Sequence, residues 1–108
     1  MRNKNMILEL LKGLKNEDGA TLKNYESVSY RTGYQVATEG DVFKIDEIEA
    51  AAACVEEFGG DCGLWVCDNL IYVDKSQRVS TLKKAIEVGK KYNQISILKW
   101  SDMSLIYL

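Results

Sequence analysis

The chain has 108 residues, 46% hydrophobic and 28% charged, which is ordinary for a single globular domain. Its net charge of −2 argues against a duplex-binding protein, and its lack of histidine removes the commonest way to activate a Ser or Cys nucleophile. No apolar run reaches the roughly 20 residues of a transmembrane helix, so we expect a soluble, cytoplasmic protein with no membrane partner.

The first third of the chain shows one helical and several extended patterns. Residues 5–15 carry apolar side chains at helical spacing, which predicts an amphipathic helix. Extended segments are expected at residues 20–24, 25–30, 34–38 and 41–45. The segments 25–30 and 34–38 alternate polar and apolar side chains, which predicts a hairpin that turns at Arg31-Thr32-Gly33. Glu39-Gly40 is expected to interrupt the chain after this hairpin.

A second helix is predicted over residues 46–58. Asp46 and Glu49 have the spacing of a capping box, and Gly59-Gly60 is typical of a helix end. The buried stripe of this helix is expected to consist of Ile48, Ala51, Ala52, Val55 and Phe58.

Residues 62–73, Cys-Gly-Leu-Trp-Val-Cys-Asp-Asn-Leu-Ile-Tyr-Val, predict a hairpin whose two-residue turn is Asp68-Asn69. Both turn residues tolerate a positive φ, and the resulting register places Trp65 opposite Tyr72. One face is then aliphatic and consists of Leu64, Val66, Ile71 and Val73. The other face consists of Trp65, Cys67, Leu70 and Tyr72.

After a polar loop at residues 74–78, the same order of elements recurs. Ser80 is expected to cap a helix over 81–92 that ends at Asn93. Its predicted inner face is Leu82, Ala85, Ile86 and Tyr92, with lysines outside. Strands are expected at 94–100 and 105–108.

The two helix-plus-hairpin segments, 46–73 and 81–108, resemble each other. In the first segment, Trp65 is followed by the tripeptide Leu70-Ile71-Tyr72. In the second, Trp100 is followed at the same separation by the same tripeptide, Leu105-Ile106-Tyr107. We therefore predict one α+β domain over residues 1–108, with an antiparallel sheet of β-hairpins, helices on one face of the sheet and an internal αββ repeat.

Residues that could carry catalysis or bind a cofactor are sparse. The sequence contains neither of the glycine-rich motifs that hold nucleotide phosphates. Cys54, Cys62 and Cys67 lie in apolar segments, where cysteine usually behaves as a small hydrophobic residue, and their spacing does not suit zinc. Cys67 is the least unfavourable nucleophile, but no nearby cation would lower its pKa. We expect no enzyme, no catalytic residue, no metal and no cofactor.

The aromatic residues Trp65, Tyr72, Trp100 and Tyr107 are the candidate partner-binding site, because Trp and Tyr are enriched at interface hot spots. They could instead belong to the core, or stack on a small molecule or on single-stranded nucleic acid. The last strand, residues 105–108, would pair with a second copy if it lies at a sheet edge, which predicts a homodimer.

The chain resembles small proteins of phages and mobile elements. The resemblance is drawn at the level of two segments, Thr32-Gly33-Tyr34-Gln35-Val36-Ala37-Thr38-Glu39-Gly40 and Asn93-Gln94-Ile95-Ser96-Ile97-Leu98-Lys99-Trp100. Some of these are anti-CRISPR proteins. The resemblance concerns size, charge and lack of catalytic motifs, and it transfers no residue. It implies a non-catalytic protein-binding module, an inhibitor or adaptor of a nucleic-acid enzyme such as a CRISPR effector. The alternative is a small-molecule or single-stranded nucleic-acid binder that uses an aromatic sheet face.

Overall fold

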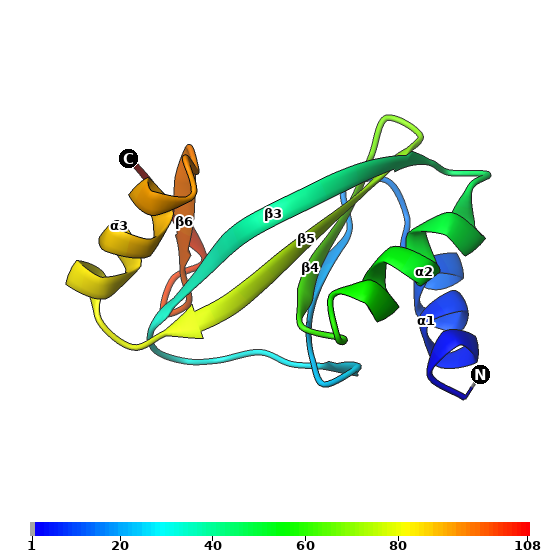
Figure 1. The fold of residues 1–108 in the computed structure, drawn as a ribbon, viewed down its shortest axis with the longest axis horizontal. Coiled ribbons are helices and arrows are strands. Elements are labelled where there is room, and N and C mark those ends of the chain that lie inside the picture. Colours follow the sequence, from blue (N-terminus) through cyan, green and yellow to red (C-terminus); the bar gives the residue numbers. More distant parts are fainter. Residues whose placement is uncertain (1) are drawn as a thin grey trace. The chain divides into compact units, whose positions relative to one another are not determined.

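The structure, a computed structural model, describes residues 2–108 (Figure 1). Within this range lie three helices and a seven-stranded antiparallel sheet, which confirms the α+β class. The helices are α1 (Arg2–Gly13), α2 (Ile48–Glu57) and α3 (Leu82–Lys91). The strands are β1 (Gly19–Lys23), β2 (Glu26–Ser27), β3 (Tyr34–Lys44), β4 (Cys62–Cys67), β5 (Leu70–Val79), β6 (Ser96–Lys99) and β7 (Ser104–Tyr107), and their order in the sheet is β2-β1-β4-β5-β3-β6-β7. No helix in the described range is long and apolar enough to cross a membrane.

The chain divides into two compact units, each with its own core. Unit 1 consists of the segment that ends at Val28 together with Gly40–Lys75, and unit 2 consists of Ser29–Glu39 and Ser76–Leu108. The long strands β3 and β5 supply residues to both units. The predicted repeat segments 46–73 and 81–108 fall one in each unit, and the repeat itself stays a prediction.

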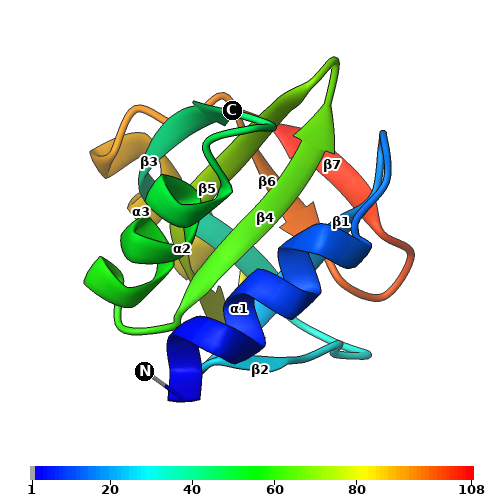
Figure 2. The same cartoon turned by 90° about the vertical axis from the view of Figure 1, so that its right-hand side faces the viewer.

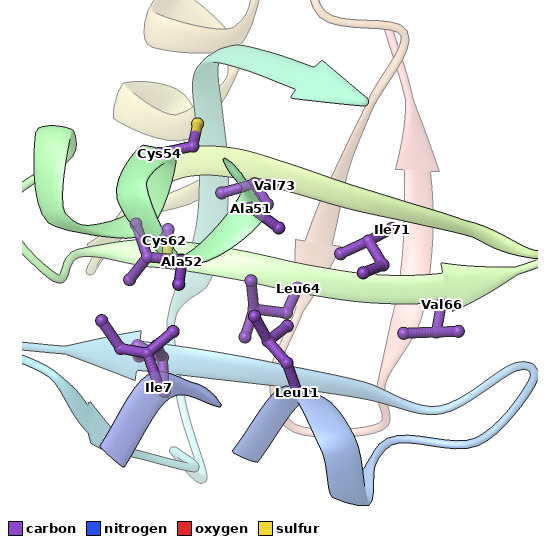
Figure 3. Close-up of a cluster of buried hydrophobic side chains, with 12 residues drawn as sticks. Ile7, Leu11, Ala51, Ala52, Cys54, Cys62, Leu64, Val66, Ile71 and Val73 are labelled. Carbon is purple, nitrogen blue, oxygen red and sulfur yellow. The ribbon is translucent and has the colours of Figure 1, made fainter. Parts of the chain in front are cut away.

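The core of unit 1 lies between two helices and one face of its strands (Figures 2 and 3). Ile7 and Leu11 come from α1, and Ala51, Ala52 and Val55 come from α2. The small alanine side chains let the backbone of α2 approach the strands closely. The strands contribute the predicted aliphatic face, and its members Leu64, Val66, Ile71 and Val73 are all buried.

The central hairpin of unit 1 has the predicted register. Cys67 lies opposite Leu70 and Trp65 opposite Tyr72, which leaves Asp68 and Asn69 as the turn. Both turn residues have a positive φ, 52° and 64°, as a type I′ turn requires. The predicted polar loop at 74–78 is wrong, because β5 continues to Val79.

The predicted capping box of α2 is wrong, although the predicted helix end is right. The N-cap is Glu47 rather than Asp46, and its side chain makes no cap hydrogen bond. The Glu47 carboxylate instead accepts from the backbone N–H of Lys44 in the preceding turn, at 2.8 Å. At the other end, Gly59 and Gly60 have positive φ and bond back to the carbonyl oxygens of the last turn, which is a Schellman motif.

The third helix also begins and ends on local hydrogen bonds. Thr81, not Ser80, is the cap, and its hydroxyl oxygen accepts from the N–H of Lys84 at 3.3 Å. Asn93 has a φ of 56° and closes a second Schellman motif, as predicted. The predicted inner face is partly wrong, because Leu82 and Tyr92 are exposed. Gly89 is buried instead, against Leu108 and Ile97, where a β-carbon would come within 2.5 Å of the Leu108 Cδ1 atom.

The predicted hairpin between residues 25–30 and 34–38 is absent from the sheet, which pairs these segments differently. Asn24 and Tyr25 both have positive φ and turn the chain directly after β1, so the two-residue strand β2 pairs with β1. β3 pairs with β6 and runs without interruption through Gly40 to Lys44. Asp74 fills the space that a side chain at position 40 would need. Glycine is therefore favoured at this position for its small size, and the strand β3 continues through it.

Candidate partner-binding site

In unit 1, Trp65 and Tyr72 form a directly opposed pair on the hairpin of β4 and β5. Because their neighbours Leu64 and Val66 face the helices, the two rings lie on the opposite face. Trp65 is 44% exposed, and its ring lies over Gly19, where a β-carbon would be 3.0 Å from the Cε3 atom. This pair therefore offers an accessible aromatic surface on a rigid hairpin.

In unit 2, Trp100 and Tyr107 do not form the corresponding pair. Tyr107 lies opposite Ser96, whereas Trp100 lies beyond the end of β6, in the loop before β7. Tyr107 is 71% exposed, but Trp100 is only 5% exposed. Of the two predicted contact residues in this unit, only Tyr107 has surface available to a partner.

Trp100 is held in place by a polar and aromatic cluster within unit 2. Its indole Nε1–H donates to the Gln35 Oε1 atom at 3.2 Å, and the Gln35 Nε2 atom donates to the Ser76 hydroxyl at 2.9 Å. The ring of Tyr30 meets the Trp100 ring at 5.4 Å in an edge-to-face arrangement. The backbone N–H of Trp100 also donates to the Gly33 carbonyl oxygen. The buried indole therefore has its hydrogen-bond partner, as a core tryptophan needs.

Arg78 is exposed and contacts residues of this cluster and its neighbour Thr32. Its guanidinium carbon is 5.1 Å from the centre of the Tyr30 ring. The Nε atom donates to the Thr32 carbonyl oxygen at 3.1 Å, and the Nη2 atom donates to the Thr32 hydroxyl at 3.0 Å. The sequence contains no signal for this arrangement, because residues 30–32 lie far from Arg78 in the chain. Tyr30 was expected in a strand, Thr32 in a turn and Arg78 in a separate loop.

The strand β7 has a regular pattern of side chains and backbone groups. Ile97 and Ile106 lie opposite each other in the hairpin and point into the core of unit 2. Leu105 and Tyr107 therefore point to the other face, where Leu105 is 53% exposed. The sequence carried this signal, since Leu105 precedes Tyr107 by two positions, but Leu105 was not predicted to belong to the site.

The outer edge of β7 carries unpaired backbone groups. The N–H of Leu108 donates to the Ile95 carbonyl oxygen, so residue 108 faces β6. Backbone groups alternate in direction along a strand, so Ile106 also faces β6 and both Leu105 and Tyr107 face outward. β7 is the last strand in the sheet order. The N–H and C=O groups of these two residues are therefore available for pairing with another strand.

The opposite edge strand, β2, is built differently. It has two residues, Glu26 and Ser27, both exposed. Proteins usually prevent unwanted pairing at a sheet edge by making the edge strand short, or by placing charged residues, lysine especially, or proline in it. β7 has the sequence Ser-Leu-Ile-Tyr and contains none of these charged or proline residues. Of the two terminal strands of the described sheet, β7 is therefore the one without charged or proline residues that would oppose pairing.

Charge is distributed unevenly between the units. Unit 1 has seven Lys and Arg residues against thirteen Asp and Glu residues, a net charge of −6. Unit 2 has seven against three, a net charge of +4. The total of −2 conceals this difference, which could have been found in the sequence only by knowing which segments fold together.

Two of the cysteines, Cys62 and Cys67, have raised pKa values, unlike a typical nucleophilic cysteine. Burial raises the pKa of the Cys62 thiol to about 12, with smaller contributions from Cys54, Asp61 and Asp74. Burial and the adjacent Asp68 carboxylate also raise the pKa of Cys67. Nucleophilic cysteines have a lowered pKa instead. Among the described residues, no group of three or more His, Cys, Asp or Glu side chains is arranged to hold a metal ion.

Comparisons of the chain with protein-family models, with curated proteins and with solved structures found no match. The candidate site therefore stands on geometry and charge alone.

Proposed function

We propose that the chain is a non-catalytic protein-binding module whose principal contact is the outer edge of β7. The observation that carries the proposal is the outward direction of the Leu105 and Tyr107 backbone groups, next to their exposed side chains. An extended segment of a partner would add to the sheet beside β7, a common mode of peptide recognition. Main-chain hydrogen bonds would supply affinity, and contacts to the two side chains would supply selectivity.

The energies involved suit a reversible complex. Each added main-chain hydrogen bond contributes about 1 kcal/mol net, and covering an exposed Leu or Tyr side chain contributes about 1.5–3 kcal/mol. Two outward residues provide up to four hydrogen bonds. The sum has to exceed the entropy lost when the partner segment becomes ordered. A longer contact that includes the neighbouring exposed residues Ile95 and Met103 would strengthen binding.

Within this class, we propose the role of an inhibitor or adaptor that acts on a nucleic-acid enzyme such as a CRISPR effector. The support for this narrower role is the resemblance in size, charge and lack of catalytic motifs to anti-CRISPR proteins. The raised pKa values of Cys62 and Cys67 support the non-catalytic part of the proposal.

The test compares two aromatic sites by affinity capture from the native cell, followed by binding measurements with the purified partner. Tyr107→Pro removes an outward N–H without removing a hydrogen bond to β6, and proline is tolerated at such edge positions. Trp65→Ala is the matched control in unit 1. We expect Tyr107→Pro to abolish capture and Trp65→Ala to leave it within about twofold of the wild type. Undiminished capture by a folded Tyr107→Pro variant would refute the proposal.

The alternative function, binding of single-stranded nucleic acid, has one supporting observation, the net charge of +4 on unit 2. Retention on an oligo(dT) column at low salt, lost as salt is raised, would favour it over protein binding. A homodimer through β7 is the third outcome. If the wild type sediments as a dimer and Tyr107→Pro as a monomer, the occupant of the β7 edge is a second copy of the chain.

A further inference from the structure

The guanidinium of Arg78 is ordered by the protein but has no carboxylate partner among the described residues. It lies between the Tyr30 ring and the backbone of Gly33, where an added β-carbon would be 2.9 Å from the Arg78 Cζ atom. Two of its five N–H groups are used by Thr32, which leaves three for a ligand. Ordering an exposed arginine normally costs side-chain entropy, and here the fold has already met that cost.

Arg78 belongs to the same unit as β7, and although β3 and β6 lie between its strand and β7 in the sheet order, its contacts lead to the loop that precedes β7. Its ring partner Tyr30 contacts Trp100, and Trp100 begins the loop that leads into β7 at Ser104. The basic residues Arg31, Lys99 and the four lysines of α3 add to the positive field of this unit. Carboxylates are the groups that a fixed arginine fork binds best in proteins, together with phosphates.

We propose that the occupant of the β7 edge is an extended acidic segment of a partner protein, and that the part of the segment that continues beyond β7, past the 100–103 loop, places a carboxylate on Arg78. The inference rests on the proposed function and specifies the chemistry of the partner. Opposite charge across an interface accelerates association and excludes partners of the same charge.

Two other occupants fit the same surface less well. A second copy paired through β7 would bring two units of charge +4 together, which opposes association. A nucleic acid would need exposed ring faces for its bases, but Trp100 is buried and one face of Tyr30 is already covered by Arg78. Of the two candidate site residues in unit 2, Trp100 and Tyr107, Tyr107 is the one with exposed surface for stacking.

The test uses two strand-forming synthetic peptides that differ only in having Glu or Gln at the alternate polar positions. Their binding to the full chain is measured by fluorescence anisotropy at low and at physiological salt. We expect the Glu peptide to bind about tenfold more tightly than the Gln peptide at low salt, with the preference reduced as salt is added. Arg78→Gln should reduce the preference to about twofold or less, and Arg78→Lys should keep part of it.

Arg31→Gln is the matched control, because it makes the same charge change in the same unit and Arg31 makes no side-chain hydrogen bond or ion pair with another residue in the described range 2–108. We expect it to lower Glu-peptide affinity by no more than about twofold. Denaturant unfolding of each variant identifies any loss of peptide affinity that comes from misfolding. The salt dependence of the preference for the Glu peptide is measured on the wild type and needs no variant.

The outcomes separate the two proposals. Tyr107→Pro should weaken both peptides equally, because it acts on the backbone pairing and not on the charge. Equal binding of the two peptides, sensitive to Tyr107→Pro, would overturn the acidic partner while leaving the β7 edge in place. Absence of binding by either peptide at about 1 mM would overturn both. A dimer that depends on Tyr107 would overturn the acidic partner in favour of a second copy of the chain. Retention on oligo(dT) that depends on Arg78 would overturn it in favour of a single-stranded nucleic acid.

Discussion

The two hairpins of this protein begin from similar residues and end in different environments. Each follows a helix that ends in a Schellman motif, and each contains a tryptophan and the tripeptide Leu-Ile-Tyr. The pairing of Cys67 with Leu70 leaves a two-residue turn, whereas the pairing of Lys99 with Ser104 leaves four residues. The longer loop removes Trp100 from the strand, and its ring turns inward to Gln35. Loop length therefore decides which tryptophan is exposed.

The hairpins also differ in their neighbours within the sheet. The strand β4 lies between β1 and β5, so its backbone groups are paired on both sides. The strand β7 has a neighbour on one side only. The first hairpin is therefore a structural element with an aromatic surface, and the second is the one that can accept another strand.

The largest expected effect contrasts a core residue of the first hairpin with a surface residue of the second. Ile71 is 1% exposed and Leu105 is 53% exposed. We expect Ile71→Ala to lower the free energy of unfolding by about 2–5 kcal/mol, because it removes buried methyl groups and leaves a cavity. Leu105→Ala should change it by about 0.5 kcal/mol or less. Urea denaturation measures both, and equal losses would contradict the assigned faces of the hairpins.

The next contrast concerns the two tryptophans. Trp100→Phe removes the donor to Gln35 and leaves a half-buried amide oxygen unpaired, which should cost about 1–3 kcal/mol of unfolding free energy. Trp65→Phe should cost about 0.5 kcal/mol or less. The two variants also isolate each indole for fluorescence. We expect the remaining Trp65 to be quenched strongly by acrylamide and the remaining Trp100 weakly, and the reverse order would refute the exposure difference.

An effect of alkaline pH on stability is expected from the first hairpin. Burial raises the pKa of Cys62 from 9.0 to about 12. Between these values the unfolded chain loses a proton that the folded chain keeps, so the contribution of Cys62 to stability is complete below pH 9 and is lost as the pH rises. The slope is about 1.4 kcal/mol per pH unit at most.

The control for this effect is Cys62→Ala, which removes the titrating thiol and leaves the other ionisable groups in place. The difference in unfolding free energy between the two proteins should shrink between pH 9 and 11 if the wild type is the more stable one at neutral pH. Parallel curves for the two proteins would show that the Cys62 thiol has the same pKa in the folded and unfolded chains.

The smallest expected effect comes from the two turns. Met103 has a φ of 59°, a conformation that costs a long side chain about 1–2 kcal/mol, so Met103→Gly should raise the unfolding free energy by about 0.5–1 kcal/mol. Asn69 has a φ of 64°, but Asn tolerates this region, so Asn69→Gly should gain only a few tenths of a kcal/mol. Ser101→Gly, in the same loop as Met103 but without a positive φ, should be destabilising. A gain as large as that of Met103→Gly would show that strain is not the cause.

The central hairpin was predictable because its register depends on adjacent residues. The Asp68-Asn69 turn and the alternation of Leu64 and Val66 with Trp65 are local features. The same is true of the helix ends at Gly59 and Asn93. The hairpin expected around residues 31–33 failed because an equally local signal, the turn at Asn24 and Tyr25, was not recognised.

The candidate site was predictable only in part. Tyr107 was chosen from the pattern of the hairpin, but the edge position of its strand was only a condition of the prediction and is set by the sheet order. The burial of Trp100 did not, because its partner Gln35 lies 65 residues earlier in the chain. The extension of β5 through Ser76 and Arg78 was also missed, because a buried serine breaks the alternation unless its partner is known.

The amino-acid sequence by itself determined the α+β class, the positions of the three helices and the faces of the central hairpin, since each of these depends on the spacing of apolar residues or on the φ of one turn. Only the tertiary structure decided the sheet order, the burial of Trp100, the fixed position of Arg78 and the separation of charge between the units. These features depend on contacts between residues distant in sequence, and such contacts are set by which strands pair rather than by any local preference.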